Sequence, residues 1–207
     1  MEIVVATSNM HKFRELKSML KGLFHGMEID IYSLHHFPEY TLPEETGSSF
    51  EENATLKALH AVRHLNRPVI ADDSGLCIPA LGGAPGILSA RYAGVEATDQ
   101  DNRTKLKAAL ENLREEERVG EFVSALAFAL PDRGLIKTTV GYAEGKLLTK
   151  EQGGGGFGYD PLFLKYDYRK TYAELDDEIK NRISHRRKAF DKLSSALLQY
   201  FEKLCVT

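Results

Sequence analysis

Residues 3–20 read IVVATSNMHKFRELKSML and carry in turn the signals of a strand, a turn and a helix. Ile3-Val4-Val5-Ala6 is a short β-rich run, and Thr7-Ser8-Asn9 directly after it are residue types that cap helices. Apolar residues then recur every three or four positions between Phe13 and Leu20, which predicts an amphipathic helix that ends near Gly22. A strand that passes through a tight turn into a helix is a basic unit of α/β folds.

The same alternation of elements continues along the chain. We predict further strands at 29–32, 68–71, 122–130, 135–143 and 161–164. We predict further helices from Ser48 or Ser49 to Leu65, over 98–118, and from about 176 to the C-terminus. Segments 37–48 and 76–94, rich in Pro and Gly, are predicted to be irregular. The predicted fold class is α/β, with helices flanking a mixed, elongated sheet.

Composition and charge narrow the classes of protein. The 207 residues are 43% hydrophobic and 28% charged, which predicts one globular domain, or one domain with a small lobe. The formal net charge of -3 offers no basic surface for nucleic acid. The N-terminal apolar run is too short for a signal peptide or a membrane span, and Cys77 and Cys205 suit a reducing compartment. We therefore expect a cytoplasmic protein with no nucleic-acid or membrane partner.

The first candidate site is the predicted turn from strand to helix at Thr7-Ser8-Asn9-Met10-His11-Lys12. Free N–H groups at a helix N-terminus, with a lysine one turn further on, can cradle an anion. The segment lacks the glycines of a P-loop. The alternative, which this motif alone favours, is a capped helix with a solvated lysine.

Two acidic pairs form the next candidates. Glu44 and Glu45 lie in a predicted loop and could bind Mg²⁺ together with substrate phosphates, although a solvated acidic loop is the commoner case. Asp72 and Asp73 follow an apolar strand, where open α/β sheets place ligands, or else begin an Asp-Ser-Gly turn. Neighbouring side chains of an extended chain point in opposite directions, so one of these two carboxylates is expected to face a metal or a water while the other braces the loop.

The last two candidates lie in the C-terminal third. Four glycines, 153–156, precede Phe157-Gly158-Tyr159-Asp160, where the backbone could approach a ligand and the aromatic rings could stack on a base, or the segment is a flexible turn. Lys180 is followed by Ser184-His185-Arg186, where Ser184 is predicted to cap the last helix. Positive charge in a first helical turn opposes the helix dipole and hints at a ligand, the alternative being a basic solvated face.

Each segment alone is a weak signal, but together and in this order they are specific. The set comprises 7–9 with Lys12, 44–47 with Phe50 and 52–54, 71–76, 81–86 leading to 89–92, 157–161, and 184–186. It closely resembles the non-canonical purine nucleoside triphosphate pyrophosphatases, the inosine/xanthosine triphosphatase or Ham1-like family. The resemblance extends from about residue 3 to about residue 200.

The resemblance implies a Mg²⁺-dependent hydrolase that cleaves between the α and β phosphates. Its substrates would be ITP, dITP and XTP, converted to the monophosphate and pyrophosphate so that the nucleotide pool is cleansed. It also implies one domain over 1–207, with two lobes about a central cleft, and a homodimer.

The resemblance also assigns roles to individual residues. Substrate phosphate would be bound by Thr7, Ser8, Asn9, Met10, His11 and Lys12. Mg²⁺ would be bound by Asp73 with Glu44 or Glu45, Asp73 would also be the proton acceptor, and Ser74 the next substrate contact. Lys57 and Arg91 would be further cleft positions, and the nucleoside would meet Phe157, Gly158, Tyr159, Asp160, Lys180, His185 and Arg186. Ser8 replaces the glycine of many members, and His11 an often small residue.

Residue chemistry agrees with direct hydrolysis, since Asp73 could deprotonate a water while Lys12 and Mg²⁺ neutralise phosphate charge. Donors from His185 and Arg186 could select a purine keto oxygen. Two alternatives stay open: a related Maf-type pyrophosphatase with another nucleotide preference, and a nucleotide sensor that binds without turnover.

Overall fold

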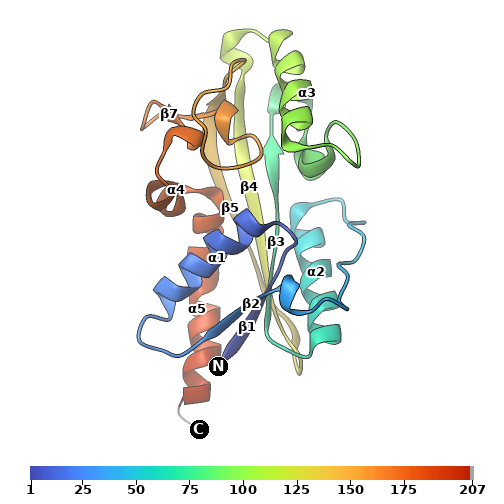
Figure 1. The fold of residues 1–207 in the computed structure, drawn as a ribbon, viewed down its shortest axis with the longest axis vertical. Coiled ribbons are helices and arrows are strands. Elements are labelled where there is room, and N and C mark those ends of the chain that lie inside the picture. Colours follow the sequence, from blue (N-terminus) through green and yellow to red (C-terminus); the bar gives the residue numbers. More distant parts are fainter. Residues whose placement is uncertain (206–207) are drawn as a thin grey trace. The chain divides into compact units, whose positions relative to one another are not determined.

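The structure is a computed structural model that describes residues 1–205, with only the backbone of 204 and 205. The side chain of Cys205 therefore lies outside the described residues. The strands are β1 (Glu2–Ala6), β2 (Asp30–Ser33), β3 (Val69–Cys77), β4 (Val119–Leu130), β5 (Gly134–Leu147), β6 (Phe163–Lys165) and β7 (Lys170–Thr171). The α-helices are α1 (Met10–Leu23), α2 (Phe50–Leu65), α3 (Asp99–Glu111), α4 (Asp177–Ile183) and α5 (His185–Cys205) (Figure 1).

The strands form one mixed sheet in the order β2-β1-β3-β4-β5-β6-β7. β1 pairs in parallel with both β2 and β3, whereas β6 is antiparallel to β5 and β7. The predicted α/β class, a mixed sheet with flanking helices, is confirmed.

The chain divides into two compact units. The first unit comprises Met1–Asp73, Ser124–Gly141 and His185–Thr207, and the second comprises Ser74–Val123 and Tyr142–Ser184. The boundaries fall inside β3, β4 and β5, so these three strands each contribute residues to both units. The cleft and the two-lobed shape that the resemblance implies stay predictions.

The first unit packs helices on both faces of its strands. Ile3 and Val5 of β1 point into a core shared with α1 and α5, which lie against each other (Figure 1). Other members of that core are Leu16, Leu20, Ile70, Leu126, Phe128, Leu193 and Leu197. Because side chains alternate along a strand, Val4 and Ala6 point to the opposite face, where α2 contacts β1.

Local capping explains where the helices of this unit begin. Asn9 caps α1 with its side-chain oxygen, and Ser49 caps α2 by accepting from the amide of Glu52. α2 ends at Leu65, and Asn66 caps it in the left-handed conformation at φ 49°. Both starts agree with the sequence prediction, because capping is decided by a few neighbouring residues.

The second unit has a core of its own. Fully buried Leu106 and Leu110 of α3 pack with residues of the strands and of the loop after β5. Other members of this core include Leu76, Ile78, Phe122, Phe163 and Tyr172. Thr98 and Asp101 form a reciprocal capping box that starts α3.

Three predicted elements differ from the structure. The helix predicted over 98–118 ends at Glu111, and Glu115–Glu117 form a separate 3₁₀ turn. The strand predicted over 68–71 continues to Cys77, because β3 lies between β1 and β4 in the sheet and is hydrogen-bonded to both. Within it, the amide of Leu76 donates to the Ser89 hydroxyl at 2.9 Å. The C-terminal helix is interrupted at Ser184, whose backbone is extended at ψ 159°.

Gly141 permits a close approach of β5 to the start of α5. A Cβ at this position would lie 2.2 Å from the carbonyl oxygen of His185 and 2.3 Å from the amide nitrogen of Ala189. Both obstructing atoms are backbone and cannot rotate away.

We expect Gly141→Ala to lower the free energy of unfolding by about 3 kcal/mol through overpacking. Gly22→Ala is the matched control, because nothing lies within 4 Å of a Cβ at this helical position. In that control the free energy of unfolding should rise by up to about 1 kcal/mol, because alanine has a higher helix propensity than glycine. Urea unfolding of both variants tests this, and equal stabilities would contradict the close approach.

Candidate functional site

The turn between β1 and α1 is built by its own polar side chains. The Asn9 side-chain oxygen accepts hydrogen bonds from the amides of His11 at 2.9 Å and Lys12 at 3.2 Å. The Thr7 hydroxyl accepts from the amide of Asn9 at 3.2 Å. Thr7 and Asn9 therefore shape the segment, and Lys12 follows one turn into the helix.

The Lys12 side chain is largely buried and ion-paired, unlike the solvated lysine of the alternative interpretation. Its ammonium lies 3.1 Å from a carboxylate oxygen of Asp72, and its side chain is 15% exposed. Burial lowers the pKa of Lys12, aided by the charges of Lys57 and Arg186, while Asp72 opposes the shift. A positive charge is thus held beside the turn that was predicted to bind phosphate.

Asp72 is the buried centre of an ion cluster. It accepts from the Ser124 hydroxyl at 2.8 Å and from the Arg186 guanidinium at 3.1 and 3.3 Å. Burial alone would raise the pKa of Asp72, but Arg186 and Lys12 outweigh it and hold the pKa far below its usual range. Arg186, only 1% exposed, also forms an ion pair with Glu15. Asp72 is therefore an ionised anchor of the cluster at neutral pH.

Asp73 points to the other face of β3. Its Oδ1 accepts from Lys57 at 2.9 Å, and the same ammonium donates to Glu45 at 2.9 Å. Asp73 Oδ2 is buried and has no hydrogen-bond partner among the described residues. Burial raises the pKa of Asp73, with Lys57 and Lys12 opposing and Glu45 adding to the rise. The predicted opposite directions of the two side chains are confirmed, and the two aspartates have different partners. That one of them faces a metal or a water stays a prediction.

Lys57 is charged despite its burial. Desolvation would lower its pKa, but the carboxylates of Asp73 and Glu45 together raise it. A cation is therefore held between the two acidic segments that the sequence singled out. Glu44, the other member of the loop pair, is exposed.

The loop that carries Glu44 and Glu45 is fastened to the first turn of α2. The amide of Gly47 donates to the Asn53 side chain at 2.8 Å, and Glu52 accepts from the amide and hydroxyl of Ser48 at 2.7 and 2.8 Å. A Cβ on Gly47 would lie 2.6 Å from Asn53 Oδ1. Glu52 therefore acts as a capping residue.

The predicted nucleoside residues other than His185 and Arg186 belong to the second unit, as do Ser74 and Arg91. There, Lys180 donates to Asp160 at 2.6 Å and lies 4.5 Å from the centre of the Phe157 ring. Asp160 also accepts from the amide of Phe157 at 2.9 Å. These three predicted residues are thus brought together.

Tyr159 has a different place from the one its sequence context suggests. Its ring is 4% exposed, and its hydroxyl donates to the Ser89 carbonyl at 2.8 Å. Burial raises its pKa above the usual range. Of the two aromatic residues predicted to stack on a base, only the half-buried Phe157 retains some exposed surface.

Sequence reasoning missed Glu15 and Ser124, the partners that complete the ion cluster. A signal existed for both. Glu15 shares its helical stripe with Met19 on an otherwise apolar face, and Ser124 is the polar residue within an apolar strand. A polar residue at a core position requires a buried partner.

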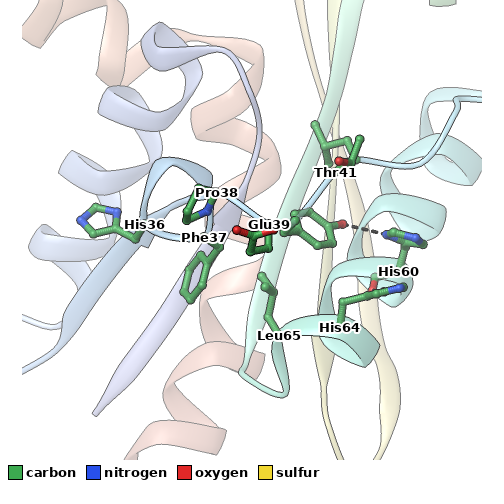
Figure 2. Close-up of a pocket in the computed structure, with 10 residues that line it drawn as sticks. His36, Phe37, Pro38, Glu39, Thr41, His60, His64 and Leu65 are labelled. Carbon is green, nitrogen blue, oxygen red and sulfur yellow. Dashed lines mark hydrogen bonds between the residues drawn. The ribbon is translucent and has the colours of Figure 1, made fainter.

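A further pocket lies in the first unit, away from these residues. Its volume is about 730 Å³, and it is lined by residues 36–42 together with His60, His64 and Leu65 of α2 (Figure 2). The Tyr40 hydroxyl and His60 Nδ1 share a hydrogen bond of 2.9 Å, and the rings of His60 and His64 lie 4.1 Å apart. Burial raises the pKa of Tyr40 to about 12. The pocket contains none of the predicted site residues.

Residues 1–205 contain neither a candidate membrane span nor a cluster of metal-ligating side chains. No described helix is long and apolar enough to cross a bilayer. Within the same residues, no three His, Cys, Asp or Glu side chains converge as a metal site.

We expect Asp72→Asn to lower the free energy of unfolding by about 3–5 kcal/mol, since it leaves buried cations without their counter-ion. Ser124→Ala, which removes one hydrogen bond to the same carboxylate, should cost about 1 kcal/mol.

Because folding lowers the pKa of Asp72, its stabilisation is complete above the unfolded pKa of about 3.9 and is lost as the pH falls below that value. Urea unfolding at pH 7 and pH 3 should therefore show the largest deficit of Asp72→Asn at pH 7. A deficit that grew in acid would contradict the ionised state.

Comparison with known proteins agrees with the motif resemblance. The sequence model of the Ham1 family matches residues 3–196. The dITP/XTP pyrophosphatase of Protochlamydia amoebophila is 52% identical over 198 residues, which cover 95% of this chain and 98% of that protein. The enzyme of the same name from Chlamydia abortus is 48% identical over 208 residues, covering 100% and 99% of the two chains.

Solved structures give the same result. A HAM1 protein from Coxiella burnetii superimposes with a TM-score of 0.84 at 38% identity, covering 96% of this chain and 99% of that one. The resemblance inferred from the motifs is thereby confirmed over nearly the whole length, and the chain belongs to the Ham1 family.

Proposed function

We propose that this protein hydrolyses non-canonical purine nucleoside triphosphates (dITP, ITP and XTP) to the monophosphate and pyrophosphate. The single observation that carries the proposal is Asp73. It is a buried carboxylate with a raised pKa, an oxygen without a partner and a lysine that fixes its orientation. The substrate class is supported by the names of two dITP/XTP pyrophosphatases whose sequences are 52% and 48% identical to this chain.

The donor set of the first unit fits Mg²⁺. Asp73 Oδ2 is available as a ligand, and the Lys57 ammonium between Asp73 and Glu45 marks a place that already favours positive charge. Mg²⁺ commonly uses one or two carboxylates and completes its shell with water and substrate phosphates, so three converging acidic side chains are not required. Asp73, together with Glu44 or Glu45, would hold the ion. When bound, Mg²⁺ neutralises phosphate charge and polarises the phosphorus–oxygen bonds.

Asp73 would accept the proton of the attacking water. A carboxylate whose pKa is raised by burial is a stronger base than one in solvent, and Lys57 keeps it in one orientation. The amides and side chains of 7–12 would bind phosphate, with Lys12 supplying charge. Asp72 and Arg186 hold that lysine in place.

The nucleoside would be bound by Phe157, Gly158, Tyr159, Asp160 and Lys180, with Ser74 and Arg91 as further contacts. Tyr159 would hold the loop in place through its hydrogen bond to Ser89 rather than stack on the base, because the residue is buried. A donor from His185 would select the keto oxygen at the purine 6 position, where adenine presents a donor instead. Arg186 would act through the ion cluster rather than by contact with the base, because its guanidinium is buried and bonded to Asp72 and Glu15. We also propose a homodimer as the working assembly, which light scattering would measure.

Pyrophosphate release from dITP, ITP, XTP, ATP and GTP, with Mg²⁺ or with EDTA, tests the proposal. We expect Mg²⁺-dependent release from the first three, lowered by about 10²–10⁴-fold in Asp73→Asn. Glu202→Gln, an exposed carboxylate of α5, is the matched control and should retain wild-type rates.

Other outcomes would point elsewhere. Tight ITP binding without turnover would indicate a nucleotide sensor, and release of orthophosphate would mean that another bond is cleaved. Preference for a different modified nucleotide would favour the Maf-type alternative. Comparison of Glu44→Gln with Glu45→Gln across a Mg²⁺ titration identifies which glutamate holds the ion.

A further inference from the structure

We propose that Asp99 and Arg103, in the first turns of α3, are positioning residues that set the backbone at Gly158 and thereby fix Phe157 for the nucleoside. The inference deepens the proposed function and rests on it. All the residues concerned belong to the second unit.

Both peptide groups of Gly158 are held by α3. The amide of Gly158 donates to Asp99 Oδ2 at 2.7 Å, and its carbonyl oxygen accepts from Arg103 Nη1 at 2.9 Å. Gly158 has φ +59°, a left-handed conformation that glycine adopts without steric cost. With its N–H and its C=O both engaged, this residue can move little relative to the helix.

The orientation of Arg103 is itself fixed. Its Nε donates to Glu151 at 3.1 Å and its Nη2 to Gln100 at 2.6 Å, so all three nitrogens are engaged. Its side chain is 14% exposed. An isolated surface ion pair contributes little to stability. A planar guanidinium that is largely buried and makes three directed hydrogen bonds is nevertheless held in one orientation.

α3 is a rigid support for these contacts. Leu106 and Leu110 are fully buried in the core of the unit, and the Thr98–Asp101 capping box fixes the first turn. Asn102, on the same turn, donates to the Ala90 carbonyl at 3.1 Å and accepts from the amide of Ala93 at 2.8 Å. The helix therefore ties the 90–93 segment and Gly158 to one element.

The contacts from α3 also restrict the position of Phe157. Its own amide is held by Asp160, and the peptide that follows it is held by Asp99 through Gly158. The ring lies against the Lys180 ammonium, 4.5 Å from its centre. Without the α3 contacts, the loop would have to be ordered each time a nucleoside binds, and the ordering cost would appear in affinity.

The variants Asp99→Ala and Arg103→Met test the inference. We expect each to raise KM for dITP about tenfold, the scale of one lost net hydrogen bond or slightly more, with kcat changed less than twofold. The split is expected because Asp99 and Arg103 belong to the second unit, whereas the residues proposed for the chemical step belong to the first. Asp99→Asn retains an oxygen acceptor for the Gly158 amide and should restore a KM close to that of the wild type.

Lys107→Met is the matched control. It removes another partner of Glu151, at 2.8 Å, but neither contact to Gly158, so it should leave KM unchanged. Unchanged KM in both Asp99→Ala and Arg103→Met would overturn the inference. So would a fall in kcat at constant KM, or failure of Asp99→Asn to rescue.

Amide hydrogen exchange of the free protein provides a readout independent of activity. We expect faster exchange at the Gly158 amide in Asp99→Ala and in Arg103→Met, and wild-type exchange in Lys107→Met. Absence of pyrophosphate release by the wild type would defeat the proposed function, and with it a nucleoside role for this contact. Unchanged exchange in an active wild-type background would defeat the inference alone.

Discussion

The buried carboxylate of Asp72 is the constraint on which the first unit depends. Removing a carboxylate from water costs several kcal/mol unless cations and donors replace the solvent. Here Lys12 of α1, Arg186 of α5 and Ser124 of β4 do so, and Glu15 balances the arginine. Because these partners come from separate elements, satisfying one charge fixes the β1–α1 turn and the start of α5 on the same strand.

Alternation along β3 turns that anchor into a functional arrangement. Asp72 faces α1 and α5, so Asp73 faces the opposite side of the sheet, toward α2. There it forms an ion pair with Lys57 of α2, which also contacts Glu45 of the preceding loop. The pKa values of the two carboxylates are shifted in opposite directions: that of Asp72 is lowered, chiefly by Arg186 and Lys12, and that of Asp73 is raised by burial. Neighbouring carboxylates whose pKa values are shifted in opposite directions are typical of sites that perform proton transfer.

Features decided locally could be predicted from the sequence, and features decided by distant pairing could not. The caps at Asn9 and Ser49 were predictable because each side chain serves its own helix. The Asp-Ser-Gly turn signal at 73–75 failed because sheet pairing keeps the strand extended to Cys77. The ion pair of Arg186 with Glu15 joins residues 171 positions apart, so the helical pattern could indicate that Glu15 needs a buried partner but not which residue it is. The motif order, rather than periodicity, led to the family.

The glycine-rich segment shows why residue type alone is a poor guide to role. A flexible turn was the simpler interpretation of 153–160, yet a Cβ on Gly153 would lie 2.5 Å from the backbone of Ala173, and a Cβ on Gly156 would lie 2.2 Å from Asp160 Oδ2. Here the glycines permit close packing as well as backbone conformations with positive φ. Within the segment Tyr159 is buried as an anchor on Ser89, which leaves Phe157 as the aromatic surface for a ligand. A loop ordered in advance binds at lower entropic cost, so its rigidity serves affinity directly.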